Sequence, residues 1–194
     1  MQAYLTTLIK PSKFTSWTGF IAALSAIVIA GIILAEKLQL AANANYVTSC
    51  SFNAIVSCSP VMSSHQAAAF WGIPNPILGL AGFSAVACLY FISLFVKLPR
   101  FIWFINAIGT IAALIFCFWL ATQALFVIQA ICIYCCGIWV LTSVLTWFGF
   151  KALLQDTKFA EAQFYVKIGL AATIIAFATM VFFAFQDYWM SLLS

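Results

Sequence analysis

The fifty residues from 101 to 150 contain no charged side chain, and no other feature limits the possible folds as strongly. A membrane-crossing helix needs about 20 apolar residues, so this stretch is too long for one crossing and suits two. The whole chain of 194 residues is 66% hydrophobic and 6% charged, whereas a soluble domain is about a quarter charged. The composition therefore predicts a single integral membrane domain, 1–194. Its net charge of +4 forms no basic stripe that would indicate nucleic-acid binding.

Apolar runs of span length predict an all-α membrane protein with five transmembrane helices around a four-helix bundle core. The predicted spans are about 17–35, 76–96, 101–125, 131–150 and 168–185. Glu36 and Lys37 are expected to close the first of them. That first run has span length, and no small-x-small cleavage site clearly ends it, so we expect a retained helix rather than a cleaved signal.

The positive charges support this division independently. Five alternating spans place one set of seven cationic residues on one side of the membrane: Lys10, Lys13, Lys97, Arg100, Lys151, Lys158 and Lys167. Only Lys37 falls on the other side. Cytoplasmic loops carry the excess of Lys and Arg, so we expect a plasma (inner) membrane protein with a cytoplasmic N-terminus.

The polar stretch 39–74 is the longest loop on the predicted outer side, and a loop of this length usually carries function. Ser59 followed by Pro60 has the pattern of a helix N-cap and first helical residue. It predicts a short helix from about Pro60 to Phe70 at the membrane interface. Asn75 and Pro76 repeat the pattern, so Asn75 is expected to cap the second span.

Seven cysteines occur in the chain, and the predicted topology brings four of them to the outer side: Cys50, Cys58, Cys132 and Cys135. That compartment is oxidising, so thiol pairs can cycle as disulfides. A tetrahedral zinc site and a purely structural set of disulfides are the alternatives. Zinc is disfavoured because seven residues separate one pair and because the outer face is oxidising. Cys88, Cys117 and Cys136 are expected to pack as small apolar residues.

The pair Cys132 and Cys135 lies about one helical turn apart at the mouth of a predicted membrane helix. Free amides at a helix N-terminus favour a thiolate at the first cysteine. A mobile loop pair can meet a soluble protein thiol, and Cys58 can then exchange with Cys132. Cys135 would face the bilayer, where the natural two-electron acceptor is a quinone.

These residues resemble the vitamin K epoxide reductase family, in its bacterial branch. The stretch CSFNAIVSCSPVMSS, residues 50–64, looks like the family's loop cysteines with a trailing serine, Ser64. Asn75 with Gly79 resembles the asparagine at the start of the family's second helix, and Cys132 to Cys135 matches its active-site pair. The resemblance covers about residues 17–151.

The resemblance implies a role for each residue. Cys50 would exchange with the partner thiol, Cys58 and Cys132 would form the relay bridge, and Cys135 would react with the quinone. Asn75 would hydrogen-bond a quinone oxygen, and Ser64 would support the site. Trp139 stands where mammalian members carry a tyrosine, so it is expected to stack at the quinone or pack in the core.

We therefore expect an enzyme that passes electrons from a thioredoxin-like protein to a membrane quinone of the menaquinone, ubiquinone or vitamin K type. Because the sequence stops at Ser194, with none of the fused thioredoxin-like domain of some bacterial members, the partner is expected to be a separate exported protein. Reduction of vitamin K epoxide itself is the enzymatic alternative. A non-catalytic membrane scaffold with structural disulfides is the alternative of another class.

Overall fold

The computed structural model describes residues 6–43, 45–53, 55–154 and 160–186, and it confirms an all-α membrane protein. Within these residues, five helices are long and apolar enough to cross a membrane. They are α2 (Lys13–Ala42), α4 (Asn75–Phe95), α5 (Arg100–Thr122), α6 (Ile133–Leu153) and α7 (Ala160–Ala184). A π-helical turn, η2 (Gln123–Ile128), continues α5 and supports the predicted break before α6.

Helix α2 is longer than the predicted span at both ends. Ser12 caps its start, because the Ser12 hydroxyl accepts a hydrogen bond from the Thr15 amide at 3.2 Å. The prediction that Glu36 and Lys37 close this helix is wrong, since the helix continues to Ala42. Both charged side chains find partners in the following loop, so neither has to end the helix.

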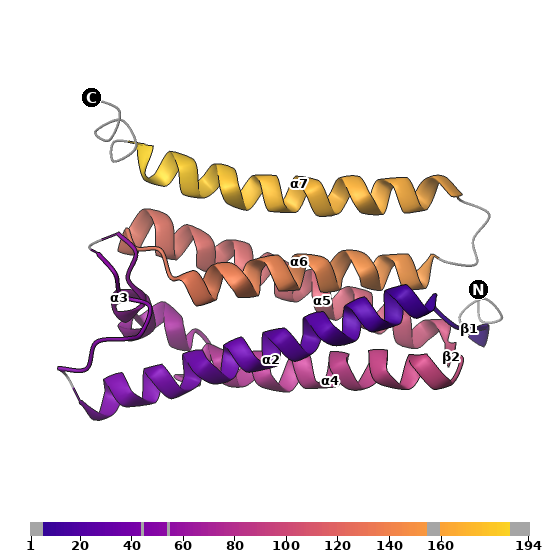
Figure 1. The fold of residues 1–194 in the computed structure, drawn as a ribbon, viewed down its shortest axis with the longest axis horizontal. Helices are drawn as coiled ribbons and strands as arrows, with labels where there is room; N and C mark the ends of the chain where they lie inside the picture. The colour runs from indigo at the N-terminus through magenta and orange to yellow at the C-terminus, as the bar shows by residue number, and fades with distance from the viewer. Residues whose placement is uncertain (1–5, 44, 54, 155–159, 187–194) are drawn as a thin grey trace.

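Four of the helices form the bundle, and α7 lies along its outside (Figure 1). Helix α2 packs against α4 and α6, and α5 packs against α6; α7 lies mainly on α6. At one end of the bundle the rings of Tyr90 and Trp103 meet edge to face, with centroids 5.4 Å apart. Both side chains are fully buried, so α4 and α5 touch at this end.

A two-stranded antiparallel sheet closes the same end of the bundle. Strand β1 (Leu8–Ile9) pairs with β2 (Leu98–Pro99), with Ile9 opposite Leu98. Ile9 is buried in the core. This pairing ties the segment before α2 to the turn between α4 and α5. The short helix α3 lies at the opposite end of the bundle (Figure 1).

The loop between α2 and α4 is helical in two pieces rather than one. Helix α3 (Cys58–Ser63) is followed by the 3₁₀ turn η1 (His65–Ala68), and Ser64 between them has extended backbone angles. The predicted single helix from Pro60 to Phe70 is therefore wrong. Ser59 is not the N-cap either, because its hydroxyl bonds to Thr48 and the helix starts earlier, after Ser57.

Candidate active site

A short backbone pairing brings the two cysteine pairs together. Val56 and Ile131 form a parallel bridge, in which the Ile131 amide donates to the Ile55 carbonyl at 2.7 Å. The Ser57 amide donates to the Ile131 carbonyl at 3.0 Å. Because Cys58 follows one side of this bridge and Cys132 follows the other, the pairing sets the two cysteines beside each other.

A turn built by Asn53 directs the loop into this bridge. Its side-chain oxygen accepts hydrogen bonds from the amides of Ile55 at 2.9 Å and Val56 at 2.7 Å. This is the way Asn side chains commonly stabilise turns. The sequence signal for the bridge is therefore Asn53, which lies two residues before the apolar pair Ile55 and Val56, and it was not part of the prediction.

Three cysteine sulfurs lie within 4.8 Å of one another: those of Cys50, Cys58 and Cys132. Cys50 and Cys58 are joined by a disulfide, with their Cα atoms 5.7 Å apart. All three residues are at most 3% exposed. A sulfur–sulfur exchange from the loop pair to Cys132 therefore needs only a small movement.

The same three sulfurs have the spacing of a metal-ligand group, which the zinc alternative requires. Zinc binds the deprotonated thiolate. In this structure two of the three sulfurs are bonded to each other and offer no thiolate. In this state the loop pair is a disulfide rather than part of a thiolate metal site.

Cys132 is the N-cap of α6, and Cys135 lies one turn along the helix. The Cys135 amide donates to the Cys132 sulfur at 3.3 Å, and the Cys135 thiol donates to the same sulfur at 2.8 Å. Both bonds favour negative charge on Cys132. The pKa of the Cys132 thiol is lowered, chiefly by the Cys135 thiol and further by the backbone amides of Cys135 and Tyr134, although burial opposes the shift.

We expect the Cys132 thiolate to persist at a pH below the ordinary cysteine pKa of about 8.5. A lowered pKa means that the thiolate is present above the shifted value and is lost only as the pH falls through it. Ultraviolet thiolate absorbance of the reduced protein, titrated against pH, measures this midpoint. The transition below the ordinary pKa should disappear in Cys132→Ala, while the other thiols still titrate at higher pH, and it should move to higher pH in Cys135→Ala. A wild-type midpoint at or above the ordinary value would contradict the assignment.

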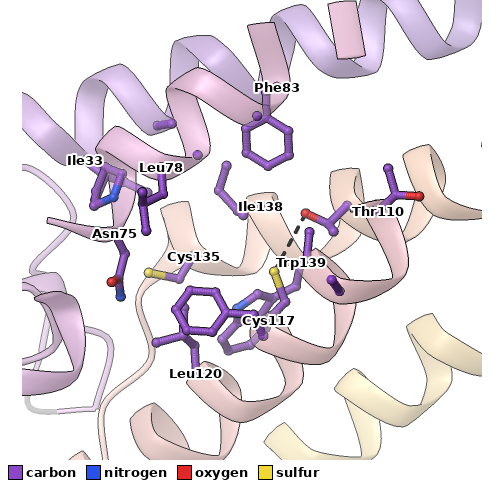
Figure 2. A pocket seen from close by; sticks show the side chains of 18 of the residues that line it. Ile33, Asn75, Leu78, Phe83, Thr110, Cys117, Leu120, Cys135, Ile138 and Trp139 are labelled. Carbon is purple, nitrogen blue, oxygen red and sulfur yellow. Dashed lines mark hydrogen bonds between the residues drawn. The ribbon is translucent and has the colours of Figure 1, made fainter. Parts of the chain in front are cut away.

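Cys135 also lines a cavity of about 710 Å³ inside the bundle. Along α4 the lining runs from Asn75 to Leu89, which is about 20 Å at 1.5 Å per residue. Asn75 and Cys135 lie at one end of this cavity and Thr110 toward the other (Figure 2). Most lining side chains are apolar, and the volume is typical of a site for a small organic ligand.

Small residues leave the cavity wall thin between α4 and α5. Four small residues of α4 and α5 both line the cavity and are exposed: Gly82, Ala85, Gly109 and Ala112. A Cβ placed on either glycine would have no heavy atom within 4 Å. The cavity therefore opens sideways, toward the position that lipid would occupy.

Asn75 does not cap α4, whose N-cap is Pro74. The Asn75 amide instead donates to the Gln66 carbonyl at 2.6 Å, and its oxygen accepts from the Ala69 amide at 2.9 Å. It thus holds η1 over the end of the cavity. An Asn side chain offers two donor hydrogens and two acceptor lone pairs, so half of its capacity remains for a ligand in the cavity that it lines.

Ser64 and Trp139 also line the cavity. Ser64 ends α3 and donates its hydroxyl to the Val61 carbonyl at 2.7 Å. Trp139 is 3% exposed, and its ring stacks on Phe177 of α7 at 5.2 Å. The structure therefore places the tryptophan ring both in the core and on the cavity wall, so the two expected roles are compatible.

Residues 45–50, the Cys50 arm, are held against α2 and α6 by polar contacts. The carboxylate of Glu36, which is 8% exposed, accepts hydrogen bonds from the Tyr46 hydroxyl at 3.1 Å and from the Ser49 amide at 3.3 Å. The Ser49 hydroxyl bonds the Tyr134 hydroxyl at 2.9 Å. Cys50 is therefore not exposed to solvent in this state.

The contacts of Glu36 and Lys37 with the cysteine loop were not predicted from the sequence, although the sequence contains a signal for them. Glu36 and Lys37 are the only charged residues between Lys13 and Lys97. A charged pair in so long an uncharged stretch indicates specific partners. In the structure Glu36 holds the Cys50 arm and Lys37 holds α3, through a bond to the Met62 carbonyl at 2.7 Å.

The fold and the site together define a redox membrane enzyme: a helical bundle in which two cysteine pairs meet at the mouth of an apolar cavity. The chain matches the model of the vitamin K epoxide reductase family over residues 17–150, which is more than half of its length. It belongs to that family. A comparison with individual curated proteins finds no match. The family match therefore covers the four bundle helices and both cysteine pairs.

Proposed function

We propose that this protein passes electron pairs from an extracytoplasmic thioredoxin-like protein to a membrane quinone, and so drives disulfide formation. The observation that supports the proposal is the chain of four sulfurs. It begins at Cys50 and Cys58 in the loop, continues to Cys132 within 4.8 Å, and ends at Cys135 on the cavity wall. The electrons would then reach the ligand in the cavity at the Cys135 sulfur.

The exchange begins with the inner pair oxidised and the loop pair reduced by the donor. The Cys58 thiolate attacks the Cys132 sulfur, forming a Cys58–Cys132 disulfide and releasing the Cys135 thiolate. The Cys50 thiolate then attacks Cys58, which restores the Cys50–Cys58 disulfide and releases Cys132. The observed disulfide pattern is the product of this transfer, with the inner pair reduced.

Donor access requires the Cys50 arm to move, because Cys50 is 3% exposed. The donor thiolate attacks Cys50, the Cys50–Cys58 bond breaks, and the donor's second thiol resolves the mixed disulfide. The two thiol protons of the donor are released in this half of the cycle. The hydrogen bonds of Glu36 to Tyr46 and Ser49 are the contacts that must open for the donor to enter.

The residues at the outer end of the cavity fit a quinone ring. Asn75 has hydrogen-bonding capacity for a ring oxygen, Trp139 offers an aromatic face, and Cys135 supplies the reacting sulfur. Closure of Cys132 on Cys135 would turn the inner pair into a disulfide again and supply two electrons and two protons, which a quinone bound there would accept. The side opening between α4 and α5 would let a prenyl tail lie in lipid.

The redox end of the bundle is proposed to face outward from the cytoplasm. In the structure Lys97, Arg100 and Lys151 lie at the ends of helices away from α3, where the positive-inside pattern expects the cytoplasm. The cysteine loop is at the other end (Figure 1). This orientation supplies the oxidising compartment that the loop disulfide needs.

Replacing Cys50 by alanine should separate the two halves of the cycle. With reduced thioredoxin-like protein as donor, we expect quinone reduction to fall at least about a hundredfold, because the entry sulfur is gone. With dithiothreitol as reductant, the loss should be far smaller, since a small dithiol can reduce the inner pair without Cys50. Absorbance of a soluble quinone analogue measures both rates in lipid nanodiscs.

Cys88→Ala is the matched control, because Cys88 is an exposed cysteine on α4 outside the sulfur chain. Its two rates should stay at the wild-type level. If the Cys50→Ala protein oxidised the donor protein at the wild-type rate, Cys50 would not be the entry point. The same assay with vitamin K epoxide as acceptor tests the enzymatic alternative.

A further inference from the structure

Lys37 is the only charged side chain that lines the cavity in the described part of the chain. It is half-buried on α2, one turn after Ile33. Ile33 packs in the same cluster as Cys58 and Cys132. Lys37 therefore lies at the redox end of the cavity, where Asn75 and Cys135 also belong to the lining.

No ion pair neutralises this ammonium group among the residues that the structure describes. The neighbouring carboxylate of Glu36 is engaged by Tyr46 and Ser49 instead. The one hydrogen bond found for the Lys37 Nζ goes to the Met62 carbonyl, while an ammonium has three N–H donors. A positive charge in an apolar, membrane-embedded cavity is costly unless an anion or a polar partner compensates it.

The charge also contradicts the topology pattern of the rest of the chain. Among the described residues, Lys37 is the one cationic residue at the redox end of the bundle, while the seven others in the chain are expected at the inner end. Since orientation does not require a positive charge there, the presence of Lys37 calls for another reason. The cavity supplies one, because ligands that carry negative oxygen would sit beside it.

We propose that Lys37 is an anion-stabilising residue of the ligand cavity, which binds the negatively charged oxygen of a quinone-type ring. The assignment rests on the proposed function and adds a charged contact to it. Two-electron reduction places negative charge on the ring oxygens until protons arrive. A fixed ammonium aimed at that position stabilises this charge more than the neutral ring.

Binding affinity tests this without any turnover. The probes are 2-hydroxy-1,4-naphthoquinone, which is an anion at neutral pH, and 1,4-naphthoquinone, which is neutral. Quenching of tryptophan fluorescence in purified protein gives both Kd values. Lys37→Met should weaken binding of the anion at least about tenfold, or about 1.4 kcal/mol, and leave the Kd of the neutral ring within about twofold.

Three further proteins make the result specific. Lys37→Gln keeps an amide donor for the Met62 carbonyl but loses the charge, so it should behave as Lys37→Met does. Lys37→Arg should retain anion binding. Lys97→Met, at an exposed lysine in the turn before α5, is the matched control and should bind both rings like the wild type.

Equal weakening of both rings, or no change for the anion in either uncharged variant, would overturn the role of Lys37. A wild-type protein that binds neither ring would overturn the proposed function itself, and the role of Lys37 with it. The thermal midpoint of each variant identifies any loss of fold, and the Lys37→Gln protein keeps the test decisive if Lys37→Met does not fold.

Discussion

Cys135→Ala is expected to abolish quinone reduction, by at least about a thousandfold, while the bundle stays folded. The loss is large because the variant removes the reacting nucleophile rather than a supporting contact. Cys135 is the sulfur of the relay that lines the cavity, and it is also the partner of Cys132 at 2.8 Å. Cys117 also lines the cavity, but its thiol bonds to the Thr142 hydroxyl and not to Cys132.

The neighbouring cysteine provides the control for this experiment. Cys136 lies on the same helix and packs in the cluster around Trp139, but it is not part of the cavity lining. Cys136→Ala should keep the reduction rate within about twofold and cost stability of about 1 kcal/mol, as for small buried truncations. Both variants are assayed with dithiothreitol and a soluble quinone analogue, beside a thermal melt.

A Cys135→Ala protein with substantial quinone reduction would contradict the assignment of the reacting sulfur. A wild-type protein without quinone reduction, whose Cys135→Ala variant loses only stability, would favour the scaffold alternative. Under the enzyme assignment, the melt of Cys135→Ala stays close to that of Cys136→Ala. Cys135→Ala and Cys136→Ala each remove one sulfur from the same helix, and only the Cys135 sulfur belongs to the proposed relay.

Gly19→Ala is expected to destabilise the bundle by about 1 to 3 kcal/mol, the usual cost of overpacking a well-packed core. A Cβ on Gly19 would overlap the ring of Tyr90. Tyr90 is fully buried, and its ring also contacts the ring of Trp103, so the ring has little room to move. The contact lies in the interface between α2 and α4.

Gly31→Ala on the same helix is the matched comparison, because a Cβ there has no heavy atom within 4 Å. Replacing this glycine should be neutral or stabilise α2 by up to about 1 kcal/mol, since alanine is the better helix former. Unfolding of both proteins in mixed micelles, followed by tryptophan fluorescence, gives the two free energies. Equal stability of the two variants would show that Tyr90 does not constrain the helix interface.

Much of the fold was predictable because charge is so scarce. The uncharged run 101–150 required two crossings, and the structure breaks it between η2 and α6. The helix ends were less predictable, since they depend on single side-chain bonds such as that of Ser12 to Thr15. The break at Ser64 separates α3, which Lys37 holds at Met62, from η1, which Asn75 holds, and local patterns do not contain these bonds.

The candidate site was predictable in its cysteines but not in its supports. Spacing and predicted topology brought Cys58 and Cys132 to the same side. The bridge of Val56 with Ile131, which makes them adjacent, is a long-range backbone pairing with no periodic signal. For Asn75 the local reading, a helix cap, was wrong because the side chain faces backward to η1.

The bridge between Val56 and Ile131 makes the length of two short segments of the chain critical for the position of the sulfurs. Backbone hydrogen bonds fix the segment from the bridge to Cys58 and the segment from the bridge to Cys132. One inserted residue in either segment would therefore move the two sulfurs out of register. Length changes among related chains should therefore be absent from these two short segments, because they would alter the meeting of the sulfurs.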